Sequence, residues 1–219
     1  TVRRFNADGS ADVTFGTNGV FTITEGAVLE QESYLFTVDA QNRPIVVSQW
    51  ATGNSNTDEI HVYRLLEDGG LDFTFGTSGK ATIDFAPFTA LNKVLVRPNG
   101  KILLAARSYY DDDMMFAQLN TDGSYDSSFG IAGRITHAYG FNERPSVVDM
   151  TLQADGKILT CGTQEVIWGN PMVVMRFDAF GFKDNTFDDD GIKHLLVGGN
   201  GDVGLSVHYY PNGKILVAG

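Results

Sequence analysis

Aspartates in loops are the residues of this sequence whose spacing could bind a cation. An Asp-Gly turn with a second aspartate four residues later occurs at Asp8 and Asp12 and returns at Asp68 and Asp122. Carboxylate oxygens in such loops are typical calcium ligands. However, Arg4 stands where an oxygen ligand would begin a calcium loop, and a cation there opposes metal binding. We therefore expect Asp8 and Asp12 to cap backbone N–H groups and Asp12 to pair with the arginine, without a cofactor; weak calcium binding is the alternative.

Two runs of three aspartates could each supply half of a carboxylate pair for general acid and base catalysis. They cover residues 111–113 and 188–190. Glycoside hydrolases use two such groups on either side of the bond that they cleave. Acidic runs are more often solvated loop tips, so we expect no catalytic residue. A glycan-active hydrolase that uses carboxylates such as Asp111 and Glu143 stays the enzymatic alternative.

The histidines and the cysteine have no spacing that suits a metal site or a nucleophile. The four histidines occupy different repeat positions, at His61, His137, His194 and His208. The single cysteine, Cys161, lies in an apolar segment and is expected to be a small core residue. The sequence also contains no nucleophile elbow, no phosphate-binding P-loop and no dinucleotide fingerprint. We therefore expect no metal ligand and no catalytic residue.

The composition excludes several classes of partner. The 219 residues include 16 Lys and Arg against 27 Asp and Glu, a net charge of −11, which does not suit nucleic acid or an anionic membrane. Hydrophobic residues make up 42% of the chain, which excludes general disorder. No apolar run approaches the ~18 residues of a membrane-spanning helix. The 25 glycines and 15 phenylalanines favour an all-β fold with many turns.

Two motifs alternate along the chain with the same period. The first reads Asp-Gly-x-x-Asp-x-x-Phe-Gly-x-x-Gly, and the first glycine of its copies is Gly9, Gly69, Gly123 and, in a degenerate copy, Gly181. The second is a tight turn followed by an apolar run, as in residues 98–105. Its equivalent positions are 43, 100, 156 and 213, and the first copy lacks the Gly-Lys pair of the others. A period of about 57 residues in two motifs indicates four structural repeats.

Each repeat contains four short segments with strand-like composition. In the second repeat these are residues 80–85, 91–97, 101–106 and 114–120, which we term strands A to D. The Asn-Gly turn between B and C suits a tight hairpin, and the apolar strand C is expected to be buried on both faces. Four strands per repeat are typical of a β-propeller blade, so we expect one all-β propeller over residues 1–219.

The four predicted repeats cover approximately residues 20–66, 80–120, 134–178 and 192–219, and the last lacks a strand D. Residues 1–6 resemble the missing strand and could complete that blade, which would close a four-bladed ring and remove an exposed edge. The alternative is a fragment of a larger propeller. Phe15, Phe75, Phe129 and Phe187 recur in register, so we expect them to pack between blades.

The paired motifs resemble the delta-60 repeat, a family of bacterial propeller-like repeats. The resemblance rests on Asp8-Gly9-Ser10 with Phe15-Gly16, on their later copies, and on Gly-Lys-Ile-Leu segments such as residues 213–216. It covers essentially the whole chain. It implies a propeller-like fold within a large exported or surface protein, and it implies no particular reaction, because the family has no established common activity.

The segments that vary between repeats are the expected binding site. In a propeller blade the D–A link and the B–C hairpin lie at one end, and the A–B and C–D loops lie at the other. The first pair is nearly invariant here, whereas the second varies and contains the aromatic residues that favour partner binding. The candidate binding residues are Trp50, Phe88, Tyr109, Tyr110, His137, Tyr139, Phe141, Arg144 and Trp168.

These observations predict a non-catalytic module of a larger exported or cell-surface bacterial protein, with the periplasm as a further location. We expect its variable loops to contact a protein or a glycan. We expect no nucleic acid and no membrane insertion. A glycan-active hydrolase and a passive spacer within a larger assembly are the alternatives, because one propeller fold serves many unrelated functions.

Overall fold

The computed structural model describes residues 1–23, 30–51, 59–85, 89–108, 113–138, 144–165, 169–196 and 201–219. Within these ranges the chain forms only strands and turns. In the same part of the chain, no helix is present that could cross a membrane. The all-β class expected from the composition is therefore confirmed.

Three antiparallel sheets occupy the middle of the chain. The first has the order β3(Glu30–Val38), β4(Pro44–Ala51), β5(Glu59–Arg64) and β6(Lys80–Ile83). The second has the order β7(Thr89–Val96), β8(Ile102–Ser108), β9(Met114–Leu119) and β10(Arg134–His137). The third contains β11(Arg144–Pro145) and β12(Asp149–Leu152), which both pair with β13(Ile158–Glu165), followed by β14(Met172–Phe177) and β15(Ile192–Leu195).

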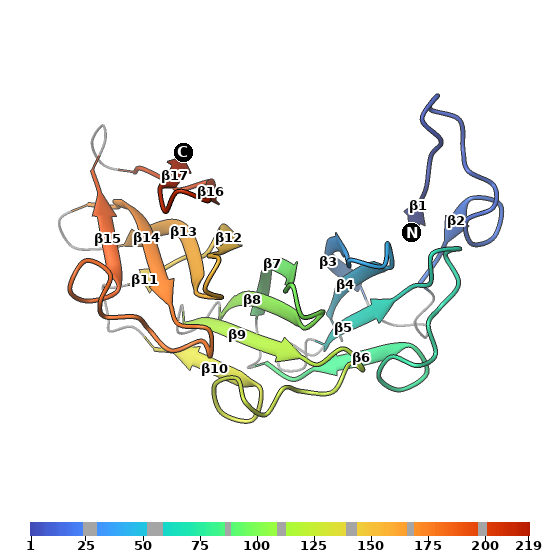
Figure 1. The fold of residues 1–219 in the computed structure, drawn as a ribbon, viewed down its shortest axis with the longest axis horizontal. Coiled ribbons are helices and arrows are strands. Elements are labelled where there is room, and N and C mark those ends of the chain that lie inside the picture. Colours follow the sequence, from blue (N-terminus) through green and yellow to red (C-terminus); the bar gives the residue numbers. More distant parts are fainter. Residues whose placement is uncertain are drawn as a thin grey trace.

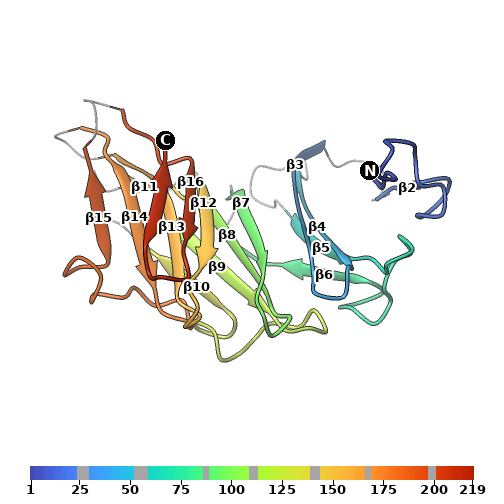
Figure 2. The same ribbon diagram turned by 45° about the horizontal axis from the view of Figure 1, so that its top comes forward.

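A two-stranded sheet stands at each end of the chain. One consists of β1(Val2–Arg3) and β2(Val20–Phe21), and the other of β16(Ser206–Tyr209) and β17(Ile215–Ala218). The five sheets follow one another along an open arc (Figure 1). Strands β3, β7 and β12 lie on the concave side of the arc, and strands β6, β10 and β15 lie on its convex side (Figure 1). Figure 2 shows the same sheets side by side after a turn of the molecule.

Each sheet combines strands from two successive sequence repeats. Strand β6, the predicted strand A of the second repeat, pairs with β5 and so completes the preceding sheet. The Asp-Gly…Phe-Gly link therefore lies within a blade. The reason is local, because the backbone N–H of Asp72 bonds to Arg64 O at 2.9 Å and the two side chains form an ion pair, which folds the link back on β5.

The N-terminal strand does not close a ring in this structure. We expected residues 1–6 to complete the last blade, but β1 pairs with β2, with Val2 opposite Phe21. Strand β17 pairs with β16. Among the described strands, the two terminal sheets share no pairing and stand at opposite ends of the arc (Figure 1). The propeller-like sheets are thus observed, whereas the four-bladed closure is not.

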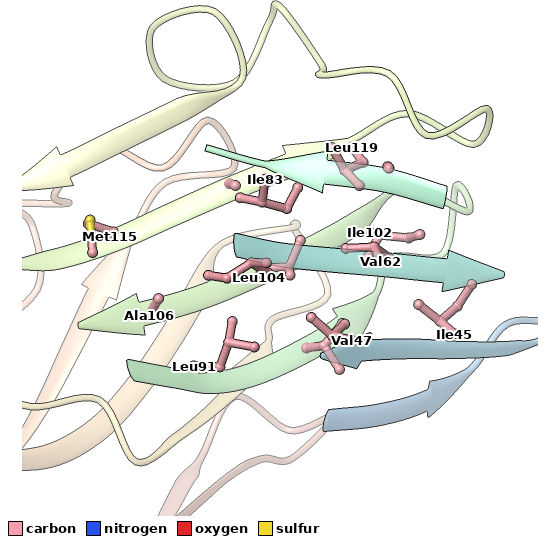
Figure 3. Close-up of a cluster of buried hydrophobic side chains, with 14 of the residues drawn as sticks. Ile45, Val47, Val62, Ile83, Leu91, Ile102, Leu104, Ala106, Met115 and Leu119 are labelled. Carbon is pink, nitrogen blue, oxygen red and sulfur yellow. The ribbon is translucent and has the colours of Figure 1, made fainter. Parts of the chain in front are cut away.

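The hydrophobic core lies between adjacent sheets rather than within one of them. Figure 3 shows the largest cluster, in which Val47 and Val62 of the first sheet meet Ile102 and Leu104 of the second. Strand β8, the predicted strand C, buries residues on both of its faces, because Leu103 turns instead toward the third sheet. This confirms the expectation for its continuous apolar run. Each blade is therefore held in place mainly by its two neighbours.

Candidate functional site

In three of its four copies the Asp-Gly…Phe-Gly turn holds an arginine in a fixed position. Asp72 Oδ1 accepts bonds from the N–H and hydroxyl of Thr74 at 3.0 and 2.6 Å. Its Oδ2 accepts a hydrogen bond from Nε of Arg64 at 2.7 Å, which makes the two side chains an ion pair. The guanidinium then lies 4.8 Å from the centroid of the Phe75 ring, a cation–π contact. The same set recurs at Arg4, Asp12 and Phe15 and at Arg176, Asp184 and Phe187.

These turns also join each blade to the next. Phe75 is fully buried, and Gly76 N–H donates to Asp122 O of the following blade at 2.6 Å. Arg64 Nη1 donates to the neighbouring carbonyl of Thr121. A Cβ on Gly123 would stand 3.1 Å from the Phe75 ring, so glycine allows the blades to approach. We call this set of arginine, aspartate, phenylalanine and glycine the inter-blade clamp.

The clamp of the second blade is built from different residues. Gln118 stands where the other blades have arginine, and it donates to Asp126 at 2.5 Å. Arg97, from the preceding hairpin, supplies the guanidinium near the Phe129 ring and donates to Ala179 O of the third blade at 3.2 Å. The positive charge and the link between blades are therefore kept while the residue that supplies them changes.

The first hairpin also keeps the pattern with different residues, and here the sequence alignment is wrong by one position. Asn42 has φ +58° and Gly100 has φ +81°, so Asn42 takes the place of the glycine. Arg43 then corresponds to Lys101. Its Nη1 lies 3.4 Å from Asp72, as Lys101 Nζ lies 2.8 Å from Asp126. In the first copy, Asn42 and Arg43 thus replace the Gly-Lys pair. Asn42 adopts the positive φ of the turn, and Arg43 places a cation beside the clamp aspartate.

The clamp aspartates are held ionised by their contacts. The hydrogen bonds from the Thr14 side chain and then Arg4 lower the pKa of Asp12 below its ordinary value. Burial alone would raise the pKa of Asp126, but bonds from Lys101, Ser128 and Gln118 outweigh burial and lower it strongly. A carboxylate with a low pKa and filled hydrogen-bonding positions is a poor general acid. The structure therefore confirms that Asp12 caps a turn and pairs with Arg4.

The A–B and C–D loops, to which the sequence assigns the predicted binding residues, begin and end at strand ends opposite the clamps. Trp50 lies at the end of β4, its backbone paired with Glu59, and Arg144 begins β11, paired with Glu165. Six of the predicted residues lie outside the described part of the chain: Phe88, Tyr109, Tyr110, Tyr139, Phe141 and Trp168. Asp111 and Glu143, the carboxylates of the hydrolase alternative, also lie outside it.

His137 is the predicted binding residue whose side chain the structure describes. Its Nε2 lies 2.8 Å from Gly181 O of the third blade, and its ring packs against Phe116 and Phe177. Burial lowers the pKa of His137 below its ordinary value, although the contact with Gly181 O opposes this effect. The imidazole thus takes part in the packing between the second and third blades.

Buried polar side chains near the loop end were not found by sequence reasoning. Gln49 of β4 accepts from Leu91 N–H at 3.2 Å and donates to Thr89 O, which joins the first blade to the second. Gln164 of β13 lies 2.6 Å from His194 Nε2 of β15. Gln49 and Gln164 occupy different positions in their strands, so no period in the sequence marks these contacts.

The concave side of the arc carries a further polar link. Lys93 of β7 forms an ion pair with Asp149 of β12 at 2.6 Å, and Asp149 Oδ2 accepts the Ser206 hydroxyl of β16 at 3.0 Å. Burial alone would raise the pKa of Asp149, but Lys93 and the backbone N–H of Val207 lower it. The innermost strands of three sheets are thus tied together by one carboxylate.

No metal or nucleophile site is formed by the described residues. Within the described ranges, no group of three or more His, Cys, Asp and Glu side chains could hold a metal ion. Burial raises the pKa of the Cys161 thiol to about 11, so the reactive thiolate is disfavoured. In the run 188–190, Asp188 pairs with Lys193 at 2.9 Å and Asp190 accepts from Ile192 N–H.

Comparison with known proteins supports a propeller of repeats. Residues 97–129 and 153–187 match the family described as "Domain of unknown function (DUF5122) beta-propeller". Both segments run from a hairpin through two strands to the clamp. Together with the observed sheets, this match shows that the chain is built of propeller-like repeats. No curated protein matches the sequence.

Two solved structures resemble the chain at low sequence identity. A protein of unknown function from Bacteroides caccae is 14% identical with a TM-score of 0.46, over 90% of this chain and 55% of that one. The polysaccharide lyase Uly1 is 11% identical with a TM-score of 0.51, over 86% of this chain and 44% of that one. The chain thus spans about half the length of these structures.

Proposed function

We propose that this chain is a non-catalytic binding module that holds a glycan through the loops opposite the inter-blade clamps. It would belong to a larger exported or cell-surface bacterial protein, and its repeats would be of the delta-60 type that the paired motifs resemble. A protein ligand on the same loops is the alternative partner. No cofactor is required for such binding.

The observation that carries this proposal is the difference between the two ends of the blades. At the clamp end, Arg64, Asp72 and Phe75 use their polar and aromatic groups for contacts within the molecule. Substitution there would weaken the interface between blades. At the other end the loop segments vary in sequence between repeats, and they contain tryptophan and tyrosine, such as Trp50 and Trp168. Rigid scaffolds that present variable loops are a common basis for binding sites.

The ligand class follows from charge and residue type. A net charge of −11 disfavours an anionic polymer, whereas aromatic rings stack well on the apolar faces of neutral sugars. The likeness in fold to a polysaccharide lyase agrees with a glycan as partner, without indicating the reaction of that protein. A neutral polysaccharide is therefore the ligand to be tested first.

The experiment measures binding of the 219-residue chain to immobilised neutral and anionic polysaccharides by tryptophan fluorescence and by retention on the matrix. Trp50→Ala and Trp168→Ala are the test variants. Phe73→Ala is the matched control, because Phe73 is 72% exposed but belongs to a clamp turn. We expect at least one tryptophan variant to lose about tenfold or more in affinity, as aromatic binding residues commonly do, and the control to bind normally.

Three results would contradict the proposal. Binding that is unchanged in both tryptophan variants would exclude the loop end as the site. Retention on none of the neutral polysaccharides would exclude the ligand class. Release of shorter chains from a polysaccharide would show catalysis, and loss of that activity in Glu143→Gln or Asp111→Asn would then establish the hydrolase alternative.

A further inference from the structure

The side chain of Gln49 links the first blade to the second at the loop end. Gln49 lies near the end of β4 and is only 2% exposed. Its Oε1 accepts a hydrogen bond from Leu91 N–H at 3.2 Å, and its Nε2 donates to Thr89 O. Burial of an amide is costly unless its hydrogen bonds are made. The two bonds meet this requirement and fix the beginning of β7 against the end of β4.

Two further buried polar residues extend this link into the second blade. Thr89, the first residue of β7, is paired with Ser108, the last residue of β8, and both are buried. The backbone N–H of Ser108 also donates to Asp113 O at 2.9 Å, so the two ends of the C–D loop stand close together. Gln49, Thr89 and Ser108 thus form one buried polar set at the ends of three strands, which we call the junction framework.

Each residue of the junction framework has an aromatic neighbour in sequence. Trp50 follows Gln49, Phe88 precedes Thr89, and Tyr109 follows Ser108. Trp50 continues β4, whereas Phe88 and Tyr109 lie outside the described residues. Peptide bonds therefore attach three of the predicted binding residues directly to the framework, one from the first blade and two from the second.

The aromatic residues predicted for the third blade are attached less directly. Trp168 is separated by two residues from Glu165, the last residue of β13, and Phe141 by two residues from Arg144, the first residue of β11. The buried Gln164 of β13 contacts His194 of β15, which belongs to the same blade. The junction of the first two blades is therefore the place where aromatic residues from different blades begin at one fixed framework.

We infer that the loop end of the junction between the first and second blades is the principal subsite of the ligand, and that Gln49 is its positioning residue. The inference rests on the proposed binding function and assigns that function to one place. Gln49 fixes the strand end that precedes Tyr109 and the strand start that follows Phe88 relative to Trp50. Aromatic residues held in this way lose less conformational entropy when a ligand binds. Gln49 is buried, so it acts through its neighbours rather than by touching the ligand.

The spacing of the blades indicates an oligosaccharide rather than a single sugar. Sheets that pack face to face stand about 10 Å apart. The first two sheets are packed in this way, with Val47 and Val62 of one against Ile102 and Leu104 of the other. A sugar ring stacks on one aromatic ring at a time. A ligand that contacts both blades therefore extends over several sugar rings, and a neutral oligosaccharide that crosses the junction fits this requirement.

The first experiment compares Gln49→Met with Gln164→Met in binding to the neutral polysaccharide. Both glutamines are buried and hydrogen-bonded near the loop end, so both variants should lose stability. In protein shown to be folded by circular dichroism, we expect Gln49→Met to bind about tenfold or more weakly and Gln164→Met to change affinity about twofold or less. Normal affinity in Gln49→Met, or an equal loss in both variants, would overturn the positioning role.

A double-mutant cycle separates positioning from a general loss of stability. If Gln49 acts through Phe88, the loss of affinity caused by Gln49→Met should become smaller when Phe88→Ala is already present. The combined loss should then be less than the product of the two single losses. Independent losses that multiply would overturn the positioning role.

Aromatic variants test the subsite without a change at Gln49. We expect Trp50→Ala, Phe88→Ala and Tyr109→Ala each to weaken binding of a long neutral oligosaccharide, and Trp168→Ala to weaken it less. Loss in Trp168→Ala alone would leave the proposed function standing and overturn this inference, whereas retention on no neutral polysaccharide would overturn both. A monosaccharide that competes as well as the long oligosaccharide would contradict a ligand that extends across the junction.

Discussion

The two ends of each blade use their polar side chains in different ways. At the clamp end, Arg64 and Arg176 make the same set of contacts in different blades, with Nε to carboxylate distances of 2.7 and 2.8 Å. At the loop end, Gln49 bridges two blades and Gln164 meets His194 within one blade. The clamp end therefore repeats one set of contacts, whereas the two described contacts at the loop end differ from each other.

This difference shows which part of the repeat the fold depends on. The second blade has lost the clamp arginine, and Arg97 from another strand end restores both the charge near the Phe129 ring and the bond to the next blade. The constraint therefore acts on the contact rather than on one sequence position. The described contacts at the loop end use different strand positions in the first and third blades. Substitutions at one end of the blades should therefore leave the contacts at the other end unchanged.

Loss of a clamp phenylalanine should have the largest effect on stability. Phe75 is fully buried between the first and second blades, so Phe75→Ala leaves a cavity and should lower the free energy of unfolding by about 3–5 kcal/mol. Urea unfolding followed by circular dichroism measures the change. Phe73→Ala, at a 72% exposed position two residues away, is the control and should change stability little. Equal effects of the two variants would show that the clamp does not hold the blades together.

The clamp glycine should be the next most sensitive position. Gly76 has φ +56°, and a Cβ there would stand 2.1 Å from Lys80 O. Gly213 has φ +85° but no atom within 4 Å of that Cβ. Both alanine variants adopt an unfavourable φ at a cost of about 1–2 kcal/mol, and Gly76→Ala should cost a further 1–3 kcal/mol or so from crowding. Thermal unfolding of the two variants isolates the crowding, and identical melting temperatures would argue against a close contact.

The repeating part of the fold could be predicted from the sequence. The spacing of the motif predicted that Phe15 and Phe75 pack between blades, and both are buried there. It also predicted the pairing of Asp12 with Arg4. Such predictions succeed because one set of contacts is repeated, so each copy supports the interpretation of the others.

The remaining features depend on contacts between segments that are distant in sequence. The role of Arg97 appears only when its guanidinium is seen beside Phe129, although the exchange of arginine for Gln118 was a signal that some other cation was needed. The one-residue shift at Asn42 required the backbone conformation, because asparagine can adopt the positive φ of glycine. The blade boundaries required the pairing of β6 with β5.

Arg97 offers a test of compensation at the clamp end. Arg97→Ala removes the bonds to Gly156 O and Ala179 O and should cost about 1–3 kcal/mol of stability. Adding Gln118→Arg should recover much of that loss. In the first blade, Arg64 and Arg43 occupy the positions of Gln118 and Lys101, and both contact the same aspartate, Asp72. The measurement is urea unfolding of the single and double variants. A double variant that is no more stable than Arg97→Ala would show that the two positions are not interchangeable.

The smallest expected effect is a pH dependence from His137. Burial lowers the pKa of this imidazole, so as the pH falls through about 6.5 the unfolded chain takes up a proton that the folded chain resists. The contribution of neutral His137 is therefore present above that pH and is lost below it. Lys183 lowers the pKa further, whereas Gly181 O and Asp178 oppose the shift.

In His137→Phe the ring contacts with Phe116 and Phe177 can persist while the titration disappears. The fall in urea midpoint between pH 7 and pH 5 should therefore be smaller in His137→Phe than in the unmodified chain. His208→Phe serves as the control for replacing a histidine ring by phenylalanine, because His208 is exposed in the C-terminal sheet. Since His137 packs between two blades, the same variant should also leave polysaccharide binding unchanged at pH 7. Reduced binding with normal stability would instead assign His137 to the loop-end site, and the division between the two ends of the blades would fail at this residue.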